Sequence, residues 1–260
     1  MDLRRVFSYM RRAADDYQMI SPGDRIAVGV SGGKDSLTLL AGLAGMRRFY
    51  PIPYEVVGVA VDVGFEGGGD WSEIEAFCRE LDVPFHVART DIYNIIFNVR
   101  KEKSPCALCS KMRRGVLHDT AKALGCNVVA LGHHLDDVVD TFMLNLFYEG
   151  RIGCFQPVSD LSRVGLRIIR PLIYMPEKDV RHFVARNPLP VKKSLCPADG
   201  NTQRTEMNQL ISDLDKKSRG LRFRIFGAIQ RGEIDGFHPA LHIPKRPSTP
   251  HDDDCQKGTS

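Results

Sequence analysis

The chain lacks any long hydrophobic run. No stretch approaches the roughly 18 consecutive apolar residues of a membrane-spanning helix, and no apolar run of signal-peptide length follows the N-terminus. We therefore expect no membrane association and a cytoplasmic location. The 260 residues, 43% of them apolar, suffice for one large α/β domain with an appendage.

Cysteine is also sparse, and its number is odd. Seven cysteines without the dense spacing of a small secreted scaffold argue against a disulfide framework and favour reduced thiols or a metal site. Cys78, Cys126 and Cys154 lie in apolar contexts, where a buried thiol is expected. Cys106 and Cys109 form a C-x-x-C pair, and no second such pair exists, which excludes a Cys₄ zinc ribbon within one chain.

A strong excess of either charge is absent too, because the net charge is only +4. The local distribution is more informative. Four basic clusters are present. One lies on a single helix face at seven-residue spacing and one just after the C-x-x-C pair: Arg4, Arg5, Arg11 and Arg12, and Lys111, Arg113 and Arg114. The other two are Lys192-Lys193 and Lys216 to Arg224. Such clusters fit an RNA backbone, although a basic cluster alone is more often a solvated surface.

The most informative segment is a glycine turn between a strand and a helix. Residues 26–30 are apolar, residues 37–49 have helical periodicity, and between them stand Ser31, Gly32, Gly33, Lys34, Asp35 and Ser36. Paired glycines let the backbone approach a phosphate, and the helix dipole and Lys34 favour its charge. The spacing differs from that of the nucleoside triphosphatase loop. We predict an anion site, the alternative being an ordinary turn at a strand end.

Strands alternate with helices along the chain. Strands are predicted at 26–30, 55–61, 84–88, 127–131 and 166–169, and helices at 2–18, 37–49, 72–81, 110–124, 135–148, 177–185 and 205–229. Ser72 and Glu75 have the spacing of a capping box. The alternation predicts an α/β fold with a doubly wound, mostly parallel sheet and flanking N- and C-terminal helices, whose ligand binds at the carboxyl ends of the strands.

Four segments divide the chain. We expect an N-terminal helix over 1–23, a nucleotide-binding domain over 24–180, a C-terminal helical region over 181–243 and a disordered tail over 244–260.

A second polar block follows the fourth predicted strand. Gly132, His133 and His134 precede Leu135, and Asp136 and Asp137 open the next helix. In a doubly wound sheet this helix start faces the same crevice as the glycine turn. The simpler interpretation is that the histidines cap the helix and the aspartates complement its dipole.

The C-x-x-C pair lies at a predicted helix start, where the dipole and nearby cations should lower the pKa of Cys106 and Cys109 toward thiolate. Cys196 is the candidate third sulfur. Three thiolates leave one metal position open, which suits a 4Fe-4S cluster better than a structural zinc. The alternatives are a redox dithiol, a three-cysteine zinc site and two inert thiols.

The glycine turn resembles the SGG-x-DS loop of the PP-loop ATP pyrophosphatases, and the G-H-x-x-D-D block resembles their second nucleotide motif. This resemblance implies a HUP-like fold that binds ATP through the glycine turn, Asp62, Gly132, His133, Asp136 and Asp137. It also implies that Arg170 contacts phosphates. Pyrophosphate release implies Mg²⁺, with Asp35, Asp136 and Asp137 as candidate ligands.

Taken together, the glycine turn, the C-x-x-C followed by Arg113-Arg114-Gly115, the second block and Arg170-Pro171-Leu172 resemble the tRNA 2-thiocytidine synthetases. The resemblance covers about residues 5 to 230 and places Cys196 at the third cluster cysteine. One departure is Lys193, which stands where relatives often have another cysteine.

This resemblance implies that ATP adenylates the 2-oxygen of cytidine 32 in tRNA and that sulfide from a 4Fe-4S cluster replaces it. Lys34, Asp35, Cys106, Cys109 and Cys196 would then be catalytic. The implied partners are tRNA, a second copy of the chain, and a sulfur donor such as a cysteine desulfurase or free sulfide. The alternatives are a 2-thiouridine synthetase, an ATP-dependent ligase or amidase on the same fold, and a non-enzymatic iron-sulfur or nucleotide-sensing RNA-binding protein.

Overall fold

The structure is a computed structural model that describes residues 3–66, 68–102, 105–193, 195–196 and 203–239. Its helices are α1 (Leu3–Asp16), α2 (Lys34–Met46), α3 (Ser72–Glu80), α4 (Pro105–Ala123), α5 (Leu135–Tyr148), α6 (Glu177–Arg186), α7 (Gln203–Lys217) and α8 (Leu221–Arg231). A π-helical segment spans Asn94–Val99 and a 3₁₀ turn spans Ile234–Gly236. Within these ranges no helix is both long and apolar enough to cross a bilayer.

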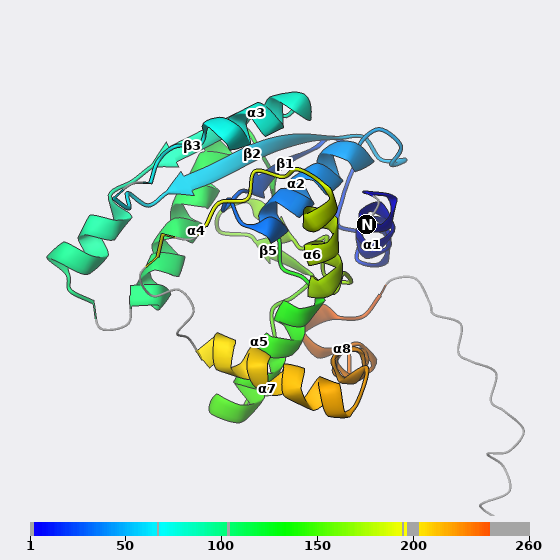
Figure 1. The fold of residues 1–260 in the computed structure, drawn as a ribbon. Helices are drawn as coiled ribbons and strands as arrows, with labels where there is room; N and C mark the ends of the chain where they lie inside the picture. The colour runs from blue at the N-terminus through cyan, green and yellow to red at the C-terminus, as the bar shows by residue number, and fades with distance from the viewer. Residues whose placement is uncertain (1–2, 67, 103–104, 194, 197–202, 240–260) are drawn as a thin grey trace, which may run out of the picture.

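The strands are β1 (Asp24–Gly29), β2 (Tyr54–Asp62), β3 (Phe85–Arg89), β4 (Val128–Ala130), β5 (Val158–Leu161) and β6 (Leu166–Ile169). They form one sheet in the order β3-β2-β1-β4-β6-β5, in which only β5 is antiparallel to its neighbour (Figure 1). The predicted mostly parallel, doubly wound sheet is confirmed.

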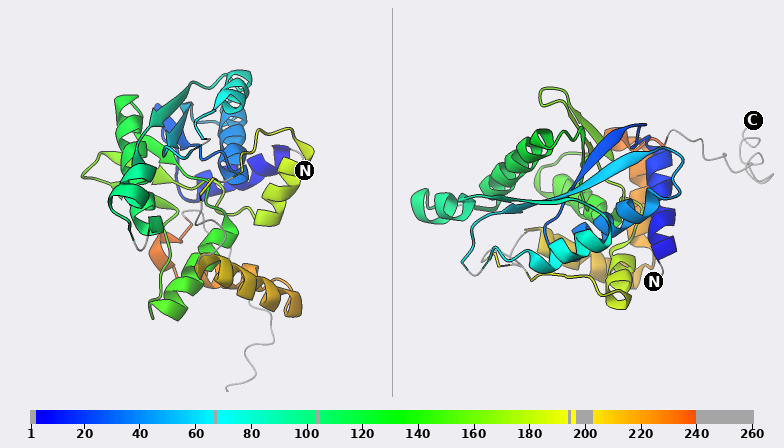
Figure 2. Two further views of the ribbon diagram at one scale, coloured as in Figure 1. Left: turned by 60° about the vertical axis from the view of Figure 1, so that its left-hand side comes forward. Right: turned by 90° about the horizontal axis from the view of Figure 1, so that it is seen from above.

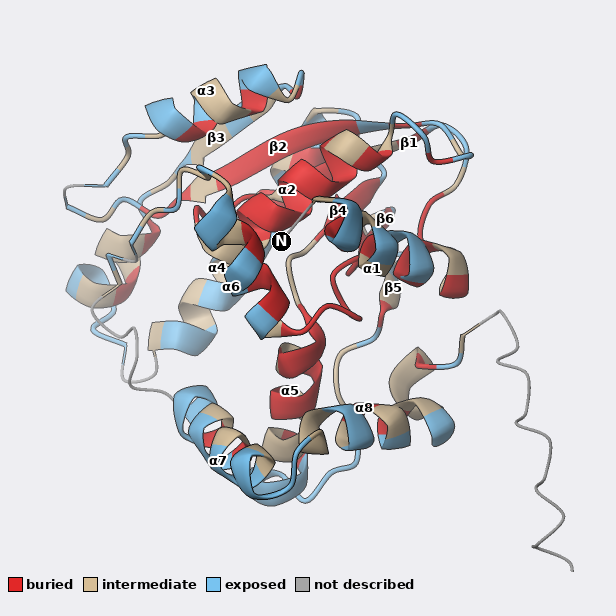
Figure 3. Cartoon of the chain, turned by 45° about the vertical axis from the view of Figure 1, so that its right-hand side comes forward, coloured by how far each residue is buried: buried red, intermediate tan, exposed pale blue. Residues whose placement is uncertain are grey.

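Alternating side chains of the strands pack on the two faces of the sheet. Ile26 and Val28 of β1 belong to the large core that also holds α1 and α2, whereas Ala27 packs with Leu117 and Ala121 of α4 on the other face. Helices α1 and α4 accordingly lie on opposite sides of the sheet (Figure 2). The central strands and α2 are buried on both sides (Figure 3).

Chain order reverses at β1, whose two neighbours are β2 on one side and β4 on the other. In open α/β sheets a crevice forms at the carboxyl ends of the strands at such a point. The glycine turn after β1 and the Gly132–Asp137 block after β4 therefore meet there, as the sequence predicted.

Several predicted elements differ from the structure. Helix α4 begins at Pro105 and includes the C-x-x-C pair, and the helix predicted over 205–229 is two helices, α7 and α8. Gly220 separates them with φ +82°, a left-handed conformation that favours glycine. The capping box at Ser72 is wrong, because Ser72 is already helical and the Asp70 carboxylate accepts its N–H at 2.9 Å.

The appendage consists of α7 and α8, which pack together against α5 below the sheet (Figures 1 and 3). The predicted disordered tail over 244–260 and the segment 197–202 lie outside the described residues.

Candidate functional site

The glycine turn forms a cradle of main-chain donors between β1 and α2. Gly32 has φ +82° and Gly33 is the N-cap of α2, so the first N–H groups of that helix, which have no intrahelical partner, face the crevice. Ser36 Oγ donates to the Gly33 carbonyl at 2.9 Å and accepts the Ser31 N–H at 3.2 Å. These bonds fix the turn in a shape that suits a phosphate.

Gly132 packs directly against this turn. A Cβ at position 132 would lie 3.0 Å from the Asp35 carbonyl carbon and 3.1 Å from the Ser36 nitrogen. A side chain there would push the turn away from β4. The glycine is thus required by the close approach of two backbone segments.

The polar contacts at the start of α5 are made by three side chains, those of His134, Asp136 and Asp137. His134 and Asp137 form a reciprocal capping box: the His134 N–H donates to Asp137 Oδ2 at 3.0 Å, and the Asp137 N–H donates to His134 Nδ1 at 3.4 Å. The simpler interpretation therefore holds for His134. Asp136 has both oxygens engaged, by the Glu177 N–H at 2.7 Å and by Arg222 Nε at 3.2 Å.

The first cavity lies between the two motifs and has a volume of about 380 Å³, within the range of small-molecule sites. Ser31, Asp35, His133 and Asp137 line one side of it, and α4 closes the other side with Ser110, Arg113, Arg114 and Leu117. Backbone donors, two carboxylates and two arginines thus surround a space that an ATP phosphate chain can enter.

Burial shifts the pKa of two residues in this wall. Burial lowers the pKa of His133 to about 3, with further lowering by Arg170, so the imidazole is neutral at neutral pH. It stacks on Phe155 at 4.8 Å between ring centroids. Burial also raises the pKa of Asp137 above its ordinary value, although His134 opposes the shift.

Arg170 lies behind the wall of the first cavity, whereas Asp62 lies at the end of β2 in the wall of a second cavity. Arg170 is buried behind Phe155, over whose ring its guanidinium lies at 5.0 Å, and Nη1 donates to the Gln156 carbonyl at 2.5 Å. Burial lowers its pKa to about 10. It supports the wall that carries His133. Asp62 ends β2, accepts the Gly64 N–H at 3.0 Å and lines a second cavity.

This second cavity, of about 630 Å³, adjoins the first and shares Ser31, Asp35, Val61 and Arg113 with it. Cys109 and Cys196 lie in its wall, and Cys106 is exposed one helical turn before Cys109. The expectation of a lowered pKa is wrong for Cys109. Burial raises its pKa, the charge of Arg113 only partly offsets this, and Cys196 and Cys106 raise it further.

The donor set around this cavity fits an iron-sulfur cluster. Cys109 and Cys196 line the cavity, Cys106 lies one helical turn before Cys109, and thiolates are the ligands that such a cluster requires. In the described part of the chain, no three ligating side chains are close enough to hold a single metal ion.

The predicted RNA-binding residues lie in two places. On α1, Arg5 pairs with Asp179 at 3.0 Å, Arg11 with Asp15 at 3.6 Å and Arg12 with Asp16 at 3.5 Å. Helix α1 also lies on the opposite side of the sheet from α4 (Figure 2). On α4, Arg113 and Arg114 line the first cavity, whereas Lys111 is not among its lining residues.

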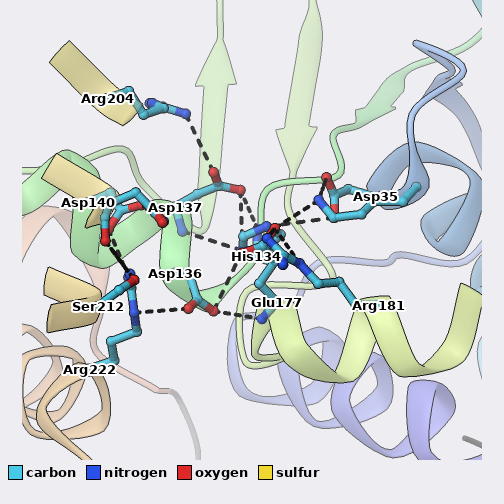
Figure 4. A network of polar contacts seen from close by, with 12 residues as sticks. Asp35, His134, Asp136, Asp137, Asp140, Glu177, Arg181, Arg204, Ser212 and Arg222 are labelled. Carbon is cyan, nitrogen blue, oxygen red and sulfur yellow. Dashed lines mark hydrogen bonds and ion pairs between the residues drawn. The ribbon is translucent and has the colours of Figure 1, made fainter. Parts of the chain in front are cut away.

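Sequence reasoning missed three residues that contact the site. Glu177 pairs with Lys34 at 3.1 Å. Arg222 pairs with Asp136, and Arg204 lies 3.5 Å from Asp137 (Figure 4). A fourth, Lys192, donates its N–H to the Gly32 carbonyl at 2.9 Å and places its Nζ over the Trp71 ring at 4.9 Å. Each contact joins residues far apart in sequence, so no local motif could indicate it.

Comparison with known proteins agrees with this geometry. The model of the PP-loop domain family matches residues 8–207. The tRNA-cytidine(32) 2-sulfurtransferase of Geobacter sulfurreducens is 39% identical over 229 residues, which are 87% of this chain and 89% of the relative. The protein of that name from Syntrophotalea carbinolica is 42% identical over 240 residues, or 90% of this chain and 91% of the relative.

Among solved structures, the U34-tRNA thiolase NcsA from Methanococcus maripaludis with its [4Fe-4S] cluster superimposes with a TM-score of 0.69 at 25% identity, over 86% of this chain and 77% of that chain. NAD⁺ synthetase from Burkholderia pseudomallei shares the fold, with a TM-score of 0.51 at 15% identity over 90% of each chain. The chain therefore belongs to the PP-loop family, in the group of its relatives named tRNA-cytidine(32) 2-sulfurtransferases.

Proposed function

We propose that this chain is an ATP-dependent tRNA sulfurtransferase that replaces the 2-oxygen of cytidine 32 with sulfur. The observation that carries the proposal is the shared wall of the two cavities. Ser31 and Asp35 of the phosphate-binding turn and Arg113 of the cysteine-bearing helix line both. Relatives that carry this activity in their name are 39% and 42% identical to the chain over about nine-tenths of its length.

The first step is activation of the base by ATP. The 2-oxygen attacks the α-phosphorus, the bond to the bridging oxygen breaks, and pyrophosphate leaves with that electron pair. The N–H groups at the start of α2 and the Lys34 ammonium, which faces the second cavity, stabilise the departing charge. Asp35 and Asp137 are the carboxylates best placed to hold Mg²⁺, because both line the first cavity, whereas Asp136 is not among its lining residues.

In the second step sulfide attacks C2 of the adenylated base and AMP leaves with the oxygen. Cys106, Cys109 and Cys196 would hold a 4Fe-4S cluster, which would supply this sulfide when bound. Arg113 faces both cavities, so its charge can accompany the phosphate of the leaving AMP. Anticodon-loop bases suit such a site because they can be splayed out without opening a duplex.

The base and the partners belong to the proposal as well. The likeness to a U34-tRNA thiolase favours a uridine as the second candidate substrate. A cysteine desulfurase or free sulfide would replenish the sulfur, in the cytoplasm where tRNA is modified. A homodimer would cover the exposed apolar side chains at the end of α5, Leu146, Phe147 and Tyr148.

The test is AMP formation by the anaerobically purified protein with ATP, Mg²⁺ and tRNA, for the wild type and for Cys106→Ser and Cys196→Ser. We expect tRNA-dependent AMP and pyrophosphate in the wild type and about four irons per chain, with the iron lost in both variants. The matched control is Cys78→Ser, which changes a buried thiol that lines neither cavity. Full product formation by Cys106→Ser would instead indicate an ATP-dependent ligase, and an absence of AMP would indicate a nucleotide-binding protein without this activity.

A further inference from the structure

Lys34 is held between two carboxylates. Its Nζ lies 2.9 Å from Asp35 Oδ2 and 3.1 Å from Glu177 Oε1. An ammonium has three N–H donors, so two anchors leave one donor for a phosphate oxygen. Burial opposes the charge of Lys34, yet Asp35 and Glu177 outweigh it and raise its pKa.

Glu177 can reach Lys34 because of where α6 starts. Glu177 is the first residue of this helix, and the N-cap is Pro176, which makes no side-chain capping bond. Asp136 of α5 supplies the missing acceptor, since its Oδ2 accepts the Glu177 N–H at 2.7 Å. A carboxylate at a helix start also complements the dipole. Asp136 thus fixes the backbone from which Glu177 extends.

Asp136 is in turn held by Arg222 of α8. Arg222 Nε lies 3.2 Å from Asp136 Oδ1, and Nη1 lies 2.8 Å from Asp140 Oδ1 (Figure 4). Its Nη2 donates to the Asn208 carbonyl at 3.2 Å and to Ser212 Oγ at 3.1 Å. The Arg222 and Asp136 side chains are each only 12% exposed, so the pair is little screened by water.

We propose that Arg222 and Glu177 are positioning residues for Lys34. Arg222 orients Asp136, Asp136 holds the start of α6, and Glu177 at that start aims the Lys34 ammonium at the phosphates of ATP. The inference rests on the proposed function in one respect, that ATP binds at the glycine turn. It adds that α8, in the C-terminal appendage, helps to set the geometry of the phosphate site.

The first test is ATP·Mg²⁺ affinity, measured by calorimetric titration of the full chain without tRNA. Glu177→Gln removes the charge, and Glu177→Asp keeps a carboxylate at the helix start but is too short to reach Lys34. We expect both to bind ATP about tenfold more weakly than the wild type, at an unchanged Tm. The matched control is Arg181→Gln, which removes the exposed cation on the same Glu177 oxygen and should leave affinity within about twofold.

A double-mutant cycle separates positioning from a merely structural role. In a Lys34→Met background, Glu177→Gln should weaken ATP binding no further, because the group that it orients is gone. Arg222→Lys, which cannot form the forked contact, should weaken binding severalfold, whereas Arg224→Lys on the exposed face of α8 should not.

Two results would overturn the proposal: ATP affinity in Glu177→Gln equal to or tighter than that of the wild type, or an undiminished effect of Glu177→Gln in the Lys34→Met background. Failure of the wild type itself to bind ATP would count against the proposed function instead. The two failures are therefore distinguishable in one set of titrations.

Discussion

At the scale of single residues, burial rather than motif membership decides what each side chain can do. His133 and His134 are adjacent in sequence, but one is a neutral, buried wall of the first cavity and the other caps α5. Asp136 and Asp137 differ in the same way, because Arg222 and the start of α6 engage Asp136 whereas Asp137 faces the cavity. A motif identifies the residues, and the environment assigns their roles.

His133 makes the stability of the protein sensitive to acid. Its pKa falls from 6.5 to about 3 on folding, so below about pH 6.5 the unfolded chain binds a proton that the folded chain does not. Its contribution to stability is present above pH 6.5 and is lost as pH falls toward 3. Each proton contributes about 1.4 kcal/mol per pH unit to this slope. Urea unfolding of the wild type and His133→Gln at pH 7 and pH 5 should show a smaller loss in the variant, and equal losses would contradict the assignment.

Asp137 should show a conflict between stability and activity. Burial raises its pKa in the folded state, so its contribution to stability is full below the unfolded value of 3.8 and is lost as pH rises through the folded value. At neutral pH the burial of this carboxyl is therefore a net cost to stability. We expect Asp137→Asn to melt at a higher temperature than the wild type while tRNA-dependent AMP formation falls about 100-fold or more. A lower Tm together with retained activity would show that Asp137 is a structural residue.

At the scale of elements, the site depends on backbone segments that touch. The glycine turn packs on Gly132 at the end of β4, and the Lys192 N–H binds the Gly32 carbonyl from the other side. The turn is thus held between a strand end and the connector that leads to Cys196. This contact brings the connector and the phosphate site into one unit.

Gly132→Ala tests the packing between strand and turn. The new Cβ would meet main-chain atoms at 3.0–3.1 Å, which cannot rotate away as a side chain does. We expect at least a tenfold loss of ATP affinity and a destabilisation of about 1–3 kcal/mol. Gly115→Ala in α4 is the matched control, since nothing lies within 4 Å of its Cβ, and it should be neutral or stabilising by up to about 1 kcal/mol. Equal ATP binding by the two variants would refute the close-packing argument.

Elements that depend on local sequence were predictable, and contacts between distant segments were not. The glycine turn and the positions of the parallel strands follow from periodicity and turn residues within a few positions. Strand β5 was missed because it has only four residues, most of them at intermediate burial. Such a segment shows little alternation of apolar and polar residues. The contacts of Glu177 with Lys34 and of Arg222 with Asp136 were missed because they depend on how α6 and α8 pack against α5. The three cysteines were predicted as a group from the C-x-x-C pair of Cys106 and Cys109 with Cys196 as the candidate third sulfur, and the family resemblance implied the same set.

At the scale of the whole molecule, the phosphate site joins the sheet, α5, α6 and the C-terminal appendage. Ligand binding to such a site should stabilise the entire fold, by RT ln(1 + [ATP]/Kd) when ATP binds only the folded chain. At a hundredfold excess over Kd this is about 2.7 kcal/mol, enough to raise the Tm by several degrees. We expect this rise in the wild type with ATP·Mg²⁺ and its loss in Lys34→Met, measured by differential scanning fluorimetry. An equal rise in Lys34→Met would place ATP elsewhere.

In the proposed function, the two adjoining cavities together convert one cytidine of tRNA to its 2-thio form. The most direct measurement is mass spectrometry of nucleosides from tRNA that lacks this modification, after incubation with anaerobically reconstituted protein, ATP, Mg²⁺ and sulfide. We predict 2-thiocytidine at position 32, formed with one AMP per sulfur incorporated and absent without ATP or with Cys196→Ser. ATP-independent thiolation, or AMP formation that leaves every pyrimidine unthiolated, would contradict the account.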